Sequence, residues 1–102
     1  MYGLLFRLKT LPGQTQPLEV SLHRLVQERV PEMEGIVAIY VMKPLSYPGE
    51  LIGLAVFDSQ SHYTQALTLH TCWYQQLELY LGNSPKWVEG EITALEITVK
   101  GL

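Results

Sequence analysis

Hydrophobic residues along this chain follow two different periods, and their order predicts six secondary-structure elements. Alternation, or a short continuous apolar run, indicates a strand, whereas apolar residues at three- and four-residue spacing indicate a helix. The pattern predicts a strand at 2–9, a helix at 17–33, strands at 35–42 and 51–57, a helix at 63–81 and a strand at 91–99. This β-α-β-β-α-β order is the ferredoxin-like plan of the α+β class. We therefore expect a four-stranded antiparallel sheet with two helices on one face.

The ends of the predicted elements carry residues that usually mark such ends. Gly13 belongs to a turn after the first strand, and Pro17 suits the first position of a helix, where its missing N–H costs nothing. Ser59 is a good N-cap for the second helix, and Gly82 is a natural stop after it.

The two middle strands predict a partner. Residues 35–42 and 51–57 are almost continuously apolar, which is typical of strands buried on both faces. A single layer of two helices can cover only one face, and leaving the other in water costs about 25 cal/mol per Å² of apolar area. The chain is also only 17% charged, whereas soluble proteins average about 25%. We therefore expect a homodimer in which a second copy covers the free sheet face.

Composition narrows the classes of function. The length of 102 residues predicts one domain that spans residues 1–102. The net charge is −3, and the seven Lys and Arg residues form no basic stripe for nucleic acid. No signal-peptide pattern follows Met1, and no apolar run is long enough to span a membrane, so the expected location is cytoplasmic. The single cysteine, Cys72, excludes an intramolecular disulfide and a multi-cysteine zinc site.

His70 is the candidate catalytic residue. It falls on the apolar stripe of the predicted helix 63–81, where a histidine would face a pocket between helix and sheet. Its unperturbed pKa near neutrality suits a general base. The alternative is a histidine at the edge of the core, bonded to a backbone carbonyl or a tyrosine.

Aromatic side chains supply the candidate substrate-binding residues. Phe6, Tyr40, Tyr63 and Tyr74 could line an apolar pocket, or they could simply fill the core and the dimer contact. Arg7 could pair with an acidic ligand, or equally with a glutamate across the dimer.

We expect neither a metal site nor a bound cofactor. His62 lies about 12 Å from His70 along the predicted helix axis, at about 1.5 Å per residue, so the two cannot bind one metal ion. The glycines are isolated and form no phosphate-binding loop.

Four segments carry a resemblance to a known family. They are residues 2–8 with the Pro12-Gly13 turn, residues 30–36, residues 49–59 and residues 89–97. In this order they resemble the dimeric α+β barrel domains related to antibiotic-biosynthesis monooxygenases. The resemblance implies that two sheets pair face to face into a barrel, which agrees with the expected second copy.

The sequence departs from the family at positions that matter for chemistry. Phe57 stands where the family usually has Trp. Members that oxidise polycyclic aromatic phenols use Asn, Trp, Tyr and Arg around a pocket between helices and sheet. Haem-degrading members use an Asn on the first strand and a Trp and a His on the second helix. Here the first strand has no Asn, and Ala66 and Gln76 fall near the Trp and His positions. No catalytic set can be carried over, and haem degradation is disfavoured.

Two hypotheses of function remain. The resemblance implies a cofactor-independent monooxygenase acting on a small aromatic or quinone-like compound, with His70 as the base and Tyr40, Tyr63 and Tyr74 positioning the ligand. The alternative is a non-catalytic dimer that binds a small hydrophobic ligand or stabilises a partner.

Overall fold

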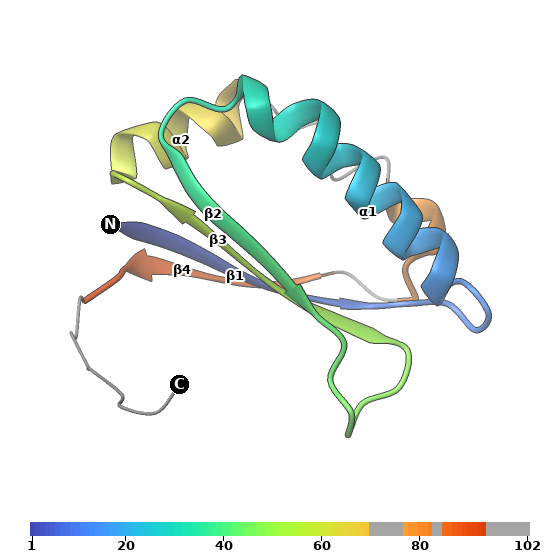
Figure 1. Cartoon of the computed structure of the whole chain (residues 1–102). Helices are drawn as coiled ribbons and strands as arrows, with labels where there is room; N and C mark the ends of the chain where they lie inside the picture. The colour runs from blue at the N-terminus through green and yellow to red at the C-terminus, as the bar shows by residue number, and fades with distance from the viewer. Residues whose placement is uncertain (70–76, 83–84, 94–102) are drawn as a thin grey trace, which may run out of the picture.

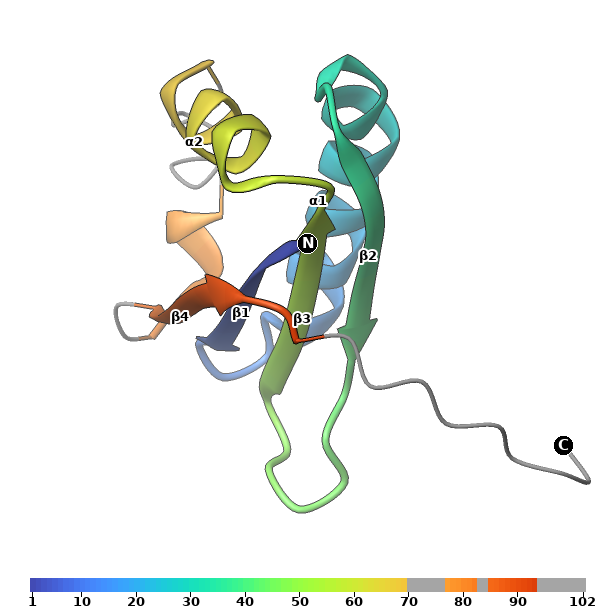
Figure 2. The same ribbon diagram turned by 90° about the vertical axis from the view of Figure 1, so that its left-hand side faces the viewer.

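Four strands form one antiparallel sheet in the spatial order β2-β3-β1-β4. The computed structural model describes residues 1–69, 77–82 and 85–93. Its elements are β1 (Tyr2–Lys9), α1 (Thr15–Arg29), the 3₁₀ turn η1 (Val30–Glu32), β2 (Ile36–Met42), β3 (Glu50–Phe57), α2 (Gln60–Leu69), the 3₁₀ turn η3 (Glu78–Tyr80) and β4 (Lys86–Glu91). Both α-helices lie on one face of the sheet, as two perpendicular views show (Figures 1 and 2). The predicted fold class is confirmed.

The first three strands and the first helix lie close to where the hydrophobic pattern predicted them. Helix α1 begins at Thr15, so Pro17 is its third residue, which still needs no N–H bond to a helical carbonyl. The helix ends at Arg29, just before the proline-containing turn η1. Ser59 caps α2 as expected, because its Oγ accepts a hydrogen bond of 3.2 Å from the backbone N–H of His62.

The predicted second helix was wrong at its C-terminal end, and its start agrees with the predicted Ser59 N-cap. Helix α2 begins at Gln60, and the chain at Glu78–Tyr80 forms a 3₁₀ turn instead of α-helix. Two backbone hydrogen bonds explain the change, because Gly82 N–H donates to the carbonyl of Lys9 (2.8 Å) and Leu11 N–H donates to that of Tyr80 (2.9 Å). These bonds hold the chain against the end of β1 and are incompatible with a helix continuing through 81.

The last strand was predicted too far along the chain. β4 occupies Lys86–Glu91 and pairs with β1 from Arg7↔Lys86 to Tyr2↔Glu91, so the prediction of a strand at 91–99 was wrong where it can be checked. Residues 94–99 of that prediction lie outside the described residues. Most of β4 is exposed, so its sequence has no need to alternate, and pairing with β1 fixes its place.

The main core lies between the sheet and the helices. Its fully buried side chains come from one face of β1, from β3, from α1 and from Leu77: Leu8, Leu18, Leu51 and Leu77. Alternation along β1 places Leu4, Phe6 and Leu8 on this face, as predicted. No helix among the described residues is long and apolar enough to cross a membrane.

A β-bulge in β2 changes which of its residues face the helices. Ile36 pairs with Phe57, and Ala38 pairs with Val56, the residue adjacent to Phe57 on β3. One residue of β2 is therefore left unpaired between Ile36 and Ala38. The extra residue reverses the alternation downstream. Ile39 therefore shares the helix side with Ala55, and Tyr40 shares the opposite side with Leu54.

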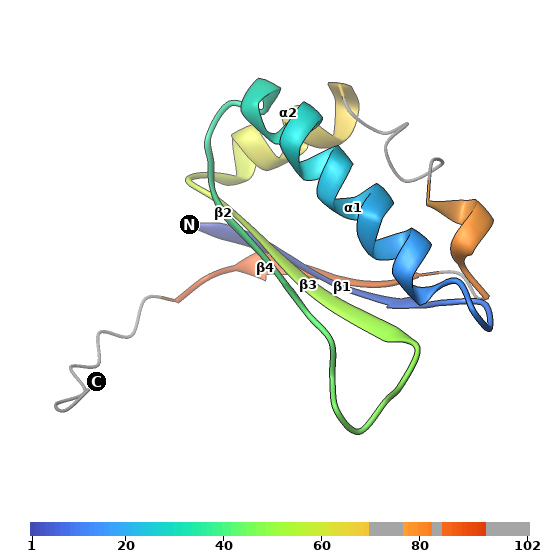
Figure 3. The ribbon, with the colours of Figure 1, turned by 45° about the vertical axis from the view of Figure 1, so that its right-hand side comes forward.

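The side of the sheet opposite the helices, here called the helix-free face, carries exposed apolar residues from three strands. Leu5 is 44% exposed, Tyr40 64%, Met42 57% and Val88 65%. The connection between β2 and β3 bends toward this side, as seen in Figure 3, and its residue Leu45 is completely exposed. Among the described residues, much of the helix-free face of β2 is thus exposed, whereas Val56 of β3 is buried there.

Candidate functional site

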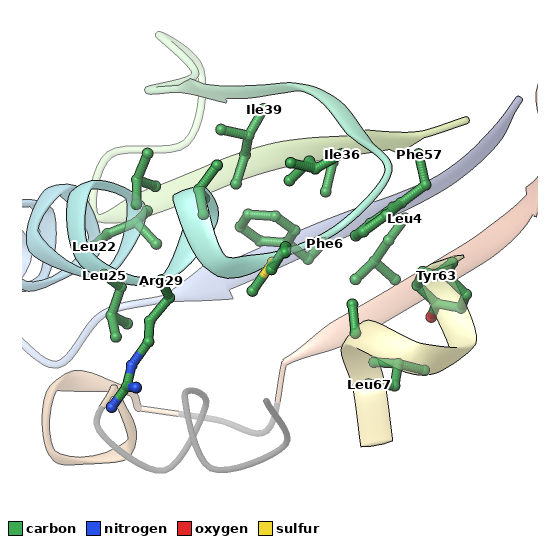
Figure 4. Close-up of a pocket in the computed structure, with 15 residues that line it drawn as sticks. Leu4, Phe6, Leu22, Leu25, Arg29, Ile36, Ile39, Phe57, Tyr63 and Leu67 are labelled. Carbon is green, nitrogen blue, oxygen red and sulfur yellow. The ribbon is translucent and has the colours of Figure 1, made fainter. Parts of the chain in front are cut away.

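A cavity of about 70 Å³ lies between the helices and the sheet (Figure 4). Residues from β1, α1, η1, β2, β3 and α2 line it, together with Met33: Leu4, Phe6, Leu22, Leu25, Val26, Arg29, Val30, Met33, Ile36, Ile39, Ala55, Phe57, Tyr63, Ala66 and Leu67. Among the described residues of this lining, only Arg29 and Tyr63 carry a side-chain nitrogen or oxygen. The cavity is therefore suited to an apolar or aromatic group.

Phe6 packs directly onto the sheet beneath the cavity. A Cβ added at Gly53, its partner on β3, would lie 1.9 Å from Phe6 Cζ. The absence of a side chain at Gly53 is what lets the ring lie against the backbone of β3. The ring of Trp87 on β4 lies 5.9 Å from that of Phe6, between centroids.

Tyr63 contributes its ring to the cavity and its hydroxyl to the sheet. The ring lies 4.9 Å from that of Tyr2 and 5.5 Å from that of Phe57, between centroids. Its hydroxyl donates a hydrogen bond to the Glu89 carboxylate on β4. Burial, followed by this bond to an anion, raises the pKa of Tyr63 well above its ordinary value. The phenol is therefore neutral and tied to Glu89.

Arg29 is the cationic residue of the described lining. It ends α1, four residues after Leu25, and its side chain is 38% exposed. In Figure 4 its guanidinium lies at the edge of the group of lining side chains, beyond the apolar ones. Arg29 thus stands at the rim of the cavity.

Two predicted substrate-binding residues do not line this cavity. Tyr40 lies on the helix-free face, because the bulge in β2 reverses its direction. Arg7 lies on the same face by simple alternation with Phe6, and it pairs with Glu50 of its own chain (2.6 Å, Nη2 to Oε2). Its guanidinium also lies 4.7 Å from the ring centroid of Tyr47. The expected grouping of these two residues with Phe6 and Tyr63 was therefore wrong for a single chain.

His62 forms a separate polar group at the start of α2. Its Nδ1 lies 2.5 Å from Asp58 Oδ1, and its Nε2 lies 4.0 Å from Glu34 Oε1. The hydrogen bond to Asp58 raises the pKa of His62, and the same bond lowers the pKa of Asp58. Gly35 makes room for the ring, since a Cβ there would lie 2.3 Å from His62 Nδ1.

His70, Tyr74 and Cys72 lie outside the described residues. The proposed roles of His70 and Tyr74 therefore stay predictions. Within the part of the chain that the structure describes, no group of three or more His, Cys, Asp or Glu side chains is placed to hold a metal ion.

Sequence reasoning missed Arg29, Gly53 and Glu89. Arg29 had a readable signal, because it continues the apolar stripe of Leu22 and Leu25 at helical spacing. A cationic side chain on a helix stripe that faces the core is unusual, and it marks the residue as a candidate for the site. Glu89 had no such signal, since its contact with Tyr63 depends on the register of β4.

Neither a protein-family model nor a curated protein matches the sequence. Solved structures match over nearly its whole length. A Deinococcus radiodurans protein provisionally named an antibiotic biosynthesis monooxygenase is 20% identical, with a TM-score of 0.81 over 99% of this chain and 100% of that one. SnoaB, a cofactor-independent oxygenase from Streptomyces nogalater, compared as a mutant, is 11% identical, with a TM-score of 0.79 over 92% and 94%.

This chain has the antibiotic biosynthesis monooxygenase fold. A protein of unknown function from Nitrosomonas europaea shares it, at 18% identity and a TM-score of 0.77 over 96% of this chain and 94% of that one. The resemblance seen in the sequence is thus confirmed for the fold. One fold hosts many activities, so the antibiotic biosynthesis monooxygenase fold does not by itself assign a reaction.

Proposed function

We propose that this protein binds a small aromatic or quinone-like compound in the cavity between helices and sheet and oxidises it with O₂ without a cofactor. The observation that carries the proposal is the apolar lining of the cavity, with Phe6, Phe57 and Tyr63 among its residues. The fold shared with SnoaB, a cofactor-independent oxygenase, supports the type of reaction.

The chemistry limits the substrate. Without a reductant, O₂ must take all four electrons from the compound that it oxidises. Conversion of an activated ring methylene to a carbonyl supplies them. One oxygen atom becomes the carbonyl oxygen, and the other leaves as water with the two methylene hydrogens. The first step is loss of a proton from that carbon, which requires a base and places negative charge on the conjugated substrate.

In this proposal Phe6 and Tyr63 form walls of the site. His70 is the base, and Tyr74 positions the ligand. Tyr40 and Arg7 have no part in the cavity of their own chain.

The alternative function is binding without catalysis. It is favoured by one feature of the described lining, which is that its two polar groups are a guanidinium at the rim and a hydroxyl held by Glu89. Neither is a base at neutral pH.

We also propose that two copies pair through the helix-free face. The exposed apolar side chains of Leu5, Tyr40 and Val88 support this pairing, because burying them removes apolar area from water.

Ligand identification tests the proposal. Native mass spectrometry of the purified protein, followed by a panel of small phenols, quinols and ring ketones with oxygen uptake recorded, should find a compound that binds and consumes O₂. The His70→Ala variant should still bind that compound but lose at least about 100-fold in rate, the usual contribution of a general base. His23→Ala, which removes an exposed imidazole on α1, is the control.

Unchanged turnover by His70→Ala would end the catalytic role of that residue. Tight binding of an aromatic compound without oxygen uptake by any compound of the panel would favour the non-catalytic alternative.

A further inference from the structure

We propose that Arg29 selects the ligand of the cavity, and that this ligand is a one-ring aromatic compound bearing an anionic oxygen, as in a carboxylate or phenolate. The inference rests on the proposed binding function of the cavity, and it adds the chemical class of the ligand. It is independent of whether the bound compound is then oxidised.

The position of Arg29 gives the first argument. The residue lies in the lining at the end of α1, where the apolar stripe through Leu22 and Leu25 reaches the mouth of the cavity. Its side chain is 38% exposed, and Leu67 across the mouth is also exposed. The stem of Arg29 thus contributes apolar surface, while its charged head stands where the cavity meets solvent.

The free hydrogen-bonding capacity of Arg29 gives the second argument. A guanidinium has five N–H donors. Among the described residues, the acidic group nearest to it is Glu32, whose Oε2 lies 3.8 Å from Arg29 Nη1. That separation is too long for a hydrogen bond, and the Glu32 side chain is itself 59% exposed. By contrast, the guanidinium of Arg7 makes two hydrogen bonds to Glu50.

The apolar lining gives the third argument. A charge beside an apolar wall interacts more strongly with an opposite charge than it would in open water. Arginine also binds carboxylate and phenolate oxygens through directed, charge-assisted hydrogen bonds. A ligand with its ring in the cavity and its anionic oxygen at the mouth would satisfy both parts of the site.

The size of the cavity limits the ring system. A protein cavity of about 150 Å³ lined by Leu, Ile and Phe is known to hold benzene, and the present cavity measures about 70 Å³. The cavity therefore takes one ring only if side chains at the mouth move, and it is too small for a fused polycyclic system.

The experiment compares benzoate with its neutral isostere benzamide, by ligand-observed NMR titration at low ionic strength. The variants are Arg29→Gln and Arg29→Lys. The matched control is Arg24→Gln, which removes an exposed guanidinium of the same helix that does not line the cavity. We expect Arg29→Gln to weaken benzoate binding about tenfold and to leave benzamide binding within about twofold, the size of one charge-assisted hydrogen bond. Arg29→Lys should restore part of the loss, and Arg24→Gln should change neither ligand.

Each other outcome is informative. Equal weakening of both ligands by Arg29→Gln would mean a structural role and overturn the inference. Benzoate binding that is unaffected by Arg29→Gln would also overturn it, while leaving the proposed binding function intact. If neither benzoate nor benzamide nor any member of the phenol and quinol panel binds the wild-type protein, the proposed function fails, and the inference fails with it.

Discussion

Among the described residues of the cavity lining, Tyr63 and Arg29 carry side-chain nitrogen or oxygen, and they differ in how these polar atoms are engaged. Tyr63 is 5% exposed, and its hydroxyl donates to Glu89. Arg29 stands at the rim, with the carboxylate of Glu32 beyond hydrogen-bond range. The first side chain therefore acts toward a ligand as an aromatic surface, and the second acts as a charge.

His62 and Asp58 form a pair whose effect on stability depends on pH. The hydrogen bond raises the pKa of His62 above 6.5 and lowers that of Asp58 below 3.8. The contribution of His62 is complete below the unfolded-state value of 6.5 and is lost as the pH rises through the higher folded value. The contribution of Asp58 is present above 3.8 and is lost as the pH falls through the lower folded value.

We predict that His62→Gln lowers the free energy of unfolding more at mildly acidic pH than at alkaline pH. At mildly acidic pH the wild-type imidazole is protonated and bound to Asp58, whereas at alkaline pH that charge is absent. Urea unfolding of both proteins at about pH 5.5 and about pH 9 measures the difference, because the stability that comes from a raised histidine pKa is present below 6.5 and is lost as the pH rises. His23→Gln serves as the control. A His62 effect that is the same at both pH values would contradict the assignment.

At the scale of elements, hydrophobic periods predicted most of the sheet, because a strand buried on one side has alternating apolar and polar residues. β1 shows this clearly, since Leu4, Phe6 and Leu8 face the core. β4 could not be placed this way because it is mostly exposed, and its register with β1 depends on backbone hydrogen bonds. Apolar residues alternate after Glu91, and the prediction therefore placed the last strand there instead of at Lys86–Glu91.

The direction of Tyr40 could not be predicted for a different reason. A single extra residue in β2 reverses which side chains face the helices. Without the bulge, Tyr40 would share the side of Ile36 and face the cavity. Phe6 and Tyr63 line the cavity, because no such irregularity separates them from their core neighbours, and their role in binding a substrate stays a prediction.

Gly53 tests how closely Phe6 packs onto β3. We predict that Gly53→Ala lowers the free energy of unfolding by about 1–3 kcal/mol, the usual cost of overpacking a core. The added methyl group would displace the Phe6 ring toward the cavity, so binding of an aromatic ligand should weaken as well. Urea unfolding and ligand titration measure the two effects.

Gly90→Ala is the matched control for this substitution. Gly90 lies on β4, the other neighbour of β1, and a Cβ there would meet nothing within 4 Å. Its effect should stay within about 0.5 kcal/mol. If the two alanine variants are equally stable, the Phe6 ring does not rest on Gly53 as described.

At the scale of the whole molecule, the two faces of the sheet differ in what covers them. Helices cover one face, and the helix-free face exposes Leu5, Tyr40, Met42 and Val88. The apolar composition of β2 and β3 predicted that a second layer is needed. It could not show the geometry of that layer, because alternation in one chain carries no information about a partner's orientation.

We predict that Leu5→Glu converts a dimer into a monomer at micromolar concentration, because the new carboxylate would be buried between two sheets. Sedimentation velocity measures the change. Val20→Glu, at a similarly exposed position on α1, should leave the dimer intact. A wild-type protein that sediments as a monomer at these concentrations would refute the face-to-face pairing.

The hydrogen bond between Tyr63 and Glu89 connects the cavity to β4 at the edge of the sheet. β4 is an outer strand of the described sheet, and through Glu89 it steadies an aromatic wall that belongs to α2. We therefore expect that a displacement of β4 would release the Tyr63 hydroxyl and disturb the aromatic side of the cavity.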